Sequence, residues 1–147
     1  MIENTKKWFE VAAPHPTDTS RTVQTGCHLE EVTEFLDSLR SFDSEKEWLD
    51  EKIEFAAAEL NHLAETLKVE HPALPVRDPV EHLDALCDQI VTAVGVAHMH
   101  GYDIIGALNE VNRSNFSKFV NGEPVFNEHG KIAKGADYTP PNLEPFV

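Results

Sequence analysis

Three glutamates, Glu30, Glu31 and Glu34, lie close together in a segment that has the apolar pattern of a helix. At about 100° of rotation per residue, their side chains fall within an arc of about 100°, opposite the apolar stripe. Clustered carboxylate oxygens are the ligands that magnesium and manganese prefer, and a carboxylate can also accept a proton from water. The alternative is that these glutamates are the solvated acidic face of an amphipathic helix.

A second acidic pair, Asp84 and Asp88, lies one helical turn apart on a later helix, about 40° apart around its axis. The rest of this helix is largely apolar, through Leu83, Leu86, Cys87, Ile90, Val94 and Ala97. We expect it to be buried on most sides, where unpaired carboxylates cost on the order of several kcal/mol each and a divalent cation would neutralise them. Alternatively, Asp84 interacts with the helix dipole and Asp88 makes a buried hydrogen bond.

The overall charge restricts the class of ligand. The chain has 147 residues, with 12 basic and 26 acidic side chains and a formal charge of -14. Such a surface would repel the phosphates of a nucleic acid polymer, so we expect no direct binding of one. A small anionic ligand would be repelled as well, unless divalent cations lay between it and the protein.

The cysteines and the hydropathy indicate the compartment. Cys27 and Cys87 do not have the spacing of a disulfide framework, and the N-terminal segment lacks the apolar core of a secretory signal. No apolar run approaches the roughly 18 residues that a membrane span needs. We therefore expect a soluble protein of the reducing cytoplasm, with no membrane as a partner.

The acidic segments belong to a chain whose pattern predicts an all-α fold, a bundle of about four to five helices. Helices are expected over 3–13, 22–40, 44–70, 79–100 and 104–119. For the fourth of them, Asp78 and Gly101 are the predicted N-cap and C-terminal stop. Prolines and glycines then predict a short hairpin and an extended tail over 120–147. We expect a single domain over 1–147, with its core in 22–119.

The order of the acidic segments and the motifs after them resembles a known family, the all-α nucleotide pyrophosphatases of the MazG and phosphoribosyl-ATP pyrophosphohydrolase type, as found in phages and bacteria. The similar stretches cover about residues 22–147. They are Glu30-Glu31-Val32-Thr33-Glu34, Asp84-Ala85-Leu86-Cys87-Asp88, Gly101-Tyr102-Asp103, 110–118, 130–135 and 138–141.

The resemblance implies a helical bundle assembled as a homodimer or homotetramer, in which acidic side chains hold magnesium, or manganese as a substitute, against a triphosphate. It makes Glu31, Glu34 and Asp88 metal ligands. Glu30 would be either a ligand or the base that activates water, so Glu30 and Glu31 are the catalytic candidates.

The second acidic motif departs from the family pattern. The usual glutamate, three residues before the aspartate, is replaced here by Ala85. The resemblance therefore makes Asp84 the substitute metal ligand. Glu81 is a lesser candidate, because it can instead complete a capping box with Asp78.

The implied reaction is attack of water on the α-phosphorus of a nucleoside triphosphate, which gives a monophosphate and pyrophosphate and would serve to clean the nucleotide pool. Asn115 and Lys118 match the family's NxxK segment and, with Lys131 and Lys134, would contact the phosphates. Gln24 would line a base pocket. Each lysine could equally be an ordinary solvated side chain.

Two other functions are compatible with the sequence. Glu59 and His62 have the Glu-x-x-His spacing of di-iron helical bundles, but a convincing second copy of that motif is missing. A non-enzymatic helical module could instead use its acidic faces to bind a partner, and it would tolerate neutral substitutions of the acids.

Overall fold

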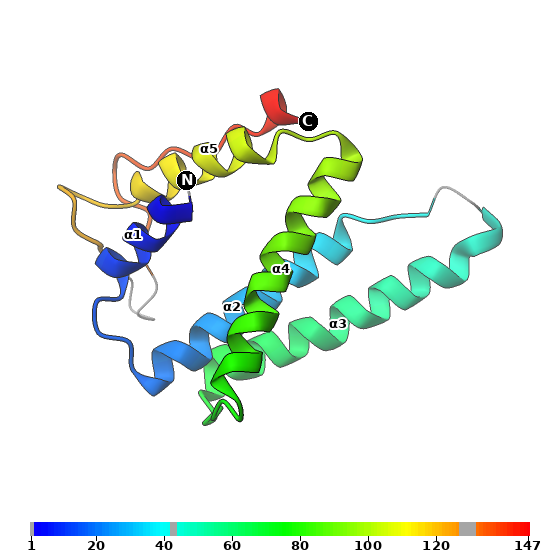
Figure 1. The fold of residues 1–147 in the computed structure, drawn as a ribbon, viewed down its shortest axis with the longest axis horizontal. Coiled ribbons are helices and arrows are strands. Elements are labelled where there is room, and N and C mark those ends of the chain that lie inside the picture. The colour runs from blue at the N-terminus through cyan, green and yellow to red at the C-terminus, as the bar shows by residue number, and fades with distance from the viewer. Residues whose placement is uncertain (1, 42–43, 127–131) are drawn as a thin grey trace. The chain divides into compact units, whose positions relative to one another are not determined.

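The computed structural model describes residues 2–41, 44–126 and 132–147, and within them the protein is all-α, as predicted (Figure 1). The helices of this part are α1 (Ile2–Ala12), α2 (Asp18–Asp37), α3 (Glu47–Glu70), α4 (Pro79–His100) and α5 (Ile104–Phe116), with the short 3-10 helices η1 (Ser44–Lys46) and η2 (Glu144–Phe146). None of the described helices is long and apolar enough to cross a membrane.

The chain divides into two compact units, Pro16–Pro75 and the combination of Met1–His15 with Val76–Val147. The prediction of a single domain therefore stays a prediction. The unit of residues 16–75 contains α2 and α3, and the other unit contains α1, α4 and α5.

Helices α2 and α3 form a hairpin with a tight contact. The capping box of α2 joins Thr17 and Ser20, so the helix begins four residues before the predicted Thr22. Where the helices meet, a Cβ added to Gly26 would lie 2.8 Å from the carbonyl oxygen of Ala64. Small side chains at this contact let the two backbones come close together.

Helix α4 has the predicted ends. The Asp78 carboxylate accepts hydrogen bonds from the backbone of Val80 and Glu81, and Gly101, at φ +80°, ends the helix in the left-handed region. Its burial differs from the prediction. Within α4 only Ala97 is buried in the single chain, whereas side chains such as Val80 (77% exposed) and Met99 (84% exposed) are accessible.

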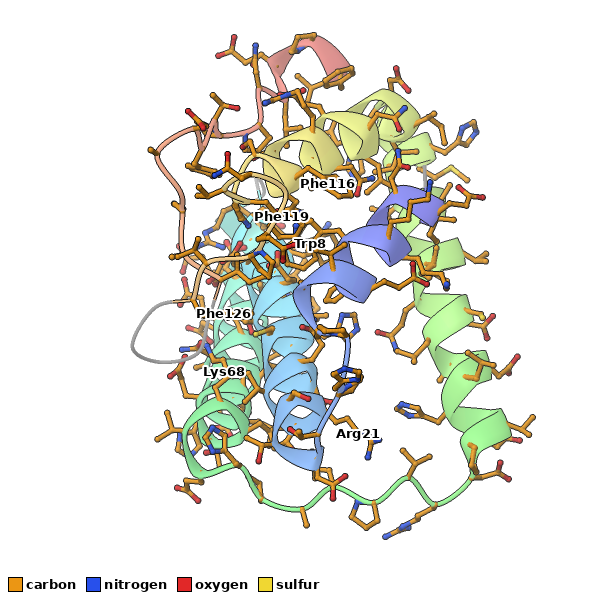
Figure 2. All side chains as sticks on the ribbon, turned by 90° about the vertical axis from the view of Figure 1, so that its left-hand side faces the viewer. Trp8, Arg21, Lys68, Phe116, Phe119 and Phe126 are labelled. Carbon is orange, nitrogen blue, oxygen red and sulfur yellow. The ribbon has the colours of Figure 1, made fainter. Side chains whose placement is uncertain are left out.

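Helix α1 packs against α5 and against the turn that follows it. Trp8 stacks on Phe119 with 5.8 Å between ring centroids, and Phe119 meets Phe116 edge to face (Figure 2). The predicted helix end at Phe119 is three residues late, because α5 ends at Phe116 and a turn carries the chain on.

The C-terminal tail returns to α5. The amide of Asp103 donates to the carbonyl oxygen of Phe146 at 2.9 Å, next to Gly106. Of the predicted hairpin, the structure contains an isolated antiparallel bridge between Phe126 and Ile132, and the turn between them lies outside the described residues.

Candidate functional site

An acidic groove of about 330 Å³ lies between α2 and α3. Its walls are Glu30, Thr33, Glu34 and Asp37 from α2, and Glu54, Ala57, Ala58 and Asn61 from α3. The buried Thr33 and Ala57 form its floor, while Glu34, Asp37 and Glu54 are exposed. The groove therefore collects four carboxylates and one amide around an open space that is large enough for ions and water.

Two of these carboxylates, Glu30 and Glu34, were singled out from the sequence, whereas Asp37 and Glu54 were missed. Asp37 follows Glu30 by seven residues and Glu34 by three, so the three share one helical face. That spacing could have revealed Asp37. Glu54 could not be predicted from the spacing within one helix, because its place in the groove depends on which side of α3 faces α2.

The chemistry of the groove suits a hard divalent cation, because its possible ligands are carboxylate and amide oxygens. In the part of the chain that the structure describes, however, no three His, Cys, Asp or Glu side chains gather closely enough to hold a metal ion. A cation bound here would require the carboxylates to turn toward it. The exposure of Glu34, Asp37 and Glu54 leaves their side chains room to do so.

The nearly buried ammonium group of Lys68 forms an ion pair with Glu30. The Lys68 side chain is only 5% exposed, and its Nζ donates to Glu30 Oε1 at 2.8 Å and to Glu65 Oε1 at 2.5 Å. Burial lowers the pKa of Lys68, but these hydrogen bonds and charges raise it by more, so its net pKa lies above the ordinary value. Lys68 thus stays charged and forms an ion pair with Glu30, which lines the groove.

The other predicted acidic residues lie elsewhere on their helices. Glu31 is exposed on α2 and does not line the groove, and Gln24 is exposed about two turns earlier on the same helix. Asp84 and Asp88 are exposed on α4, in the other unit, as is Glu81 in the first turn of that helix.

The predicted phosphate contacts at the end of α5 and in the turn after it lie against α1. Lys118 Nζ donates to Asn115 Oδ1 at 2.8 Å and lies 5.9 Å from the centre of the Trp8 ring. In the tail, Lys134 Nζ lies 4.9 Å from the ring centre of the Tyr138 side chain. Lys131 lies outside the described residues.

An ion pair that the sequence reading missed fixes the tail to α5. Arg113 donates to both carboxylate oxygens of Glu110, each at 2.7 Å, and also to Thr139 and to the carbonyl oxygen of Pro140. Glu110 also accepts from the amide of Asn142 at 3.0 Å. These hydrogen bonds, first of all that of Arg113, lower the pKa of Glu110 to about 2. The spacing Glu110-x-x-Arg113 is the signal that could have revealed this pair.

Comparison of the chain with protein-family models found no match, and searches of curated proteins and of solved structures found none either.

Proposed function

We propose that the protein is a magnesium-dependent nucleoside triphosphate pyrophosphohydrolase of the MazG-like type, which converts a nucleotide to its monophosphate and pyrophosphate. The observation that carries the proposal is the groove between α2 and α3, where Glu30 and Glu34 of the family-like motif meet Asp37 and Glu54. The carboxylates of the groove would repel a triphosphate in the absence of a cation. A cation bound between the carboxylates and the phosphates would turn this repulsion into attraction.

In this proposal, different residues of the hairpin of α2 and α3 bind the metal ion and accept the proton of the attacking water. When bound, magnesium would neutralise phosphate oxygens and lower the pKa of a coordinated water. Glu34, with Asp37 and Glu54 beside it, offers the oxygen ligands, and a carboxylate of the pair Glu30 and Glu31 accepts the proton of the attacking water. Water forms a bond to the α-phosphorus, the bond from that phosphorus to the bridging oxygen breaks, and pyrophosphate leaves.

The resemblance adds Asp84 and Asp88 of α4 as further ligands in this proposal. It also adds assembly into a homodimer or homotetramer. The accessible apolar side chains of α4 support that assembly, since large exposed apolar surfaces of soluble proteins commonly mark interfaces. Size-exclusion chromatography with light scattering measures the oligomeric state directly.

Pyrophosphate release from a panel of nucleoside triphosphates with magnesium tests the activity. We expect Glu34→Gln and Asp88→Asn each to lower kcat by about 100-fold or more, because each removes a charge that would hold the cation. Glu59→Gln is the matched control. Glu59 is exposed on α3 outside the groove, so this variant should retain the activity of the unmodified protein.

The circular dichroism spectrum and the oligomeric state of each variant must match those of the unmodified protein for the comparison to hold. Full activity in both Glu34→Gln and Asp88→Asn would show that the acids are not part of a catalytic site. It would favour the non-enzymatic binding module instead.

A further inference from the structure

Positions on one side of α5 meet the C-terminal segment 139–146, and we call them the α5 stripe. They are Gly106, Glu110, Arg113 and the C-cap residue Ser117. At about 100° of rotation per residue, they lie within about 60° of one another around the helix axis. The first position of the stripe meets Phe146 and the last meets Thr139, so the segment runs antiparallel to α5 (Figure 1).

The stripe binds main-chain groups of the segment. The amide of Asn142 donates to Glu110 Oε1 at 3.0 Å, and Arg113 Nη2 donates to the carbonyl oxygen of Pro140 at 3.1 Å. The amide of Thr139 donates to the hydroxyl of the C-cap residue at 3.0 Å. Hydrogen bonds to main-chain groups give affinity for an extended backbone, whatever its side chains.

Two features of the segment add selectivity. The Phe146 ring lies against the backbone of α5 at Gly106, where an added Cβ would lie 2.5 Å from Cε1 of the ring, and the amide of Asp103 donates to the Phe146 carbonyl oxygen. Pro140 and Pro141 restrict the backbone, which lowers the cost of ordering the segment on the stripe. The ligand that fits the stripe is therefore an extended peptide with adjacent prolines and an aromatic side chain near its end.

The segment is held with little apolar burial. Residues 139–145 are exposed, and Phe146 is half-buried. Local opening of such a segment costs less free energy than unfolding of a buried core, so the segment can leave the stripe while α5 stays folded. A free peptide then competes with the segment, and its apparent affinity is reduced by the fraction of molecules in which the segment fills the stripe.

We propose that the α5 stripe is a peptide-binding site whose resident ligand, the segment 139–146, exchanges with the same segment of a second copy of the chain. The second copy is the partner because its segment offers the same amides, carbonyl oxygens, prolines and aromatic ring. The stripe contains none of the residues assigned to metal or phosphate, so the outcome of its test does not depend on the proposed function.

A fluorescein-labelled peptide of residues 137–147 tests the site by fluorescence polarisation. The unmodified full chain is compared with an open-tail variant, which is the full chain with Asn142→Pro and Phe146→Ala. Proline removes the amide that donates to Glu110, and alanine removes the ring. We expect the open-tail variant to bind the peptide about tenfold more tightly than the unmodified protein, because its own segment no longer fills the stripe.

A second peptide that contains the same two changes is the control for specificity. It should bind the open-tail variant about tenfold more weakly than the natural peptide. Equal affinity of the two peptides, or equal affinity of the two proteins for the natural peptide, would overturn the proposal. This comparison of peptides uses one protein, so it does not depend on the folding of any further variant.

Substitution of Arg113 in the open-tail variant tests whether the peptide binds the stripe. Arg113→Met should weaken peptide binding about tenfold or more, since Arg113 contacts both the segment and Glu110. Arg21→Met is the matched control, because Arg21 forms an exposed pair with Asp18 at the same spacing on α2. It should change the affinity less than about twofold. Unchanged affinity in a folded Arg113→Met variant would refute the site.

Hydrogen exchange of the Asp103 amide locates the peptide independently. This amide donates to the Phe146 carbonyl oxygen at 2.9 Å, so it should exchange faster in the open-tail variant and slow down again when the peptide is added. Binding of the peptide without renewed protection of Asp103 would place it elsewhere and contradict the proposal.

Exchange between copies is tested by competition. The full chain with Arg113→Met alone keeps the natural segment on a weakened stripe, so it should displace the labelled peptide from the open-tail variant. The same chain with Asn142→Pro and Phe146→Ala added should not displace it. If neither protein displaces the peptide, or if both do so equally, the segment of a second copy is not the partner.

Discussion

Lys68 illustrates how a charge is kept inside the hairpin of α2 and α3. Its ammonium is nearly buried between Glu30 and Glu65, and its aliphatic stem runs past Gly26, at 2.8 Å from a Cβ placed there. A buried ammonium without partners would be expensive, so the two glutamates make this position tolerable for a lysine. The stem fills space at the contact of the helices, while the head group pairs with Glu30, which lines the groove.

The substitution Lys68→Met tests this account, since methionine keeps much of the stem and removes the charge. We expect the free energy of unfolding to fall by about 1 kcal/mol, a modest value because both glutamates are partly exposed and screened by solvent. Chemical denaturation at neutral pH measures it. The control is Lys6→Met, which breaks the exposed pair of Lys6 with Glu10 and should change stability by less than about 0.5 kcal/mol.

The same lysine gives a defined pH dependence. Its pKa is higher in the folded protein than the ordinary 10.5, because its hydrogen bonds to the two glutamates outweigh the effect of burial. Stability from such a group is complete below the unfolded pKa and is lost as pH rises through the folded pKa. The difference between the unmodified protein and Lys68→Met should therefore be constant from neutral pH to just below pH 10.5, where both glutamates are ionised, and shrink above it. A constant difference across that range would contradict the assignment.

At the scale of elements, the contact of α2 with α3 depends on Gly26. A Cβ at this position would lie 2.8 Å from the Ala64 carbonyl oxygen and 3.2 Å from Leu67 Cβ, which are closer than ordinary contacts. The carbonyl belongs to the helix backbone and cannot move away without disturbing α3. The two helices would have to separate to admit a methyl group.

We expect Gly26→Ala to destabilise the protein by about 1–3 kcal/mol through overpacking, although alanine is the better helix former. Gly95→Ala in α4 is the matched control. Apart from the neighbouring backbone of α4 itself, no atom of the described residues lies within 4 Å of a Cβ there, so this change should stabilise the protein by up to about 1 kcal/mol. Thermal unfolding of both variants decides the matter, and equal effects of the same sign would refute the role of Gly26.

The ends of the helices were predictable where a local cap defines them. Asp78 and Gly101 specify both ends of α4 through their own side chain and backbone, so the sequence is sufficient there. The start of α2 was missed because Thr17 and Ser20 cap it before the apolar pattern begins. Positions of this kind depend on local hydrogen bonds rather than on periodicity.

The candidate site was predictable only in part. Glu30 and Glu34 share a helical face, and that face is a property of one helix. The opposite wall, with Glu54, and the counter-charge of Lys68 depend on which side of α3 faces α2. Such pairings come from tertiary packing, so single-helix patterns do not reveal them.

At the scale of the whole molecule, the charge of -14 makes ions a large influence on stability. We expect magnesium to raise the melting temperature more than sodium does at the same ionic strength, because specific binding adds to general screening. Magnesium at 100 times its Kd would add about 2.7 kcal/mol, or a shift of several degrees for a chain of this size. Differential scanning fluorimetry with both salts measures the shift.

The groove variants separate specific binding from screening in that experiment. Glu34→Gln should lose the part of the shift that only magnesium gives, whereas Glu59→Gln, outside the groove, should keep it. Equal shifts with both salts in the unmodified protein would mean that the acids act only as a diffuse surface charge.

Each of the two units contains one free thiol, and the two thiols differ in their exposure to solvent. Cys27 is half-buried on α2 and Cys87 is exposed on α4. Maleimide chemistry can therefore attach a reporter to each unit without any mutation, and the more accessible Cys87 should be labelled first. A donor and an acceptor dye attached in this order report the distance between the hairpin of α2 and α3 and the other unit by energy transfer, and the same pair measures whether an added ligand changes it.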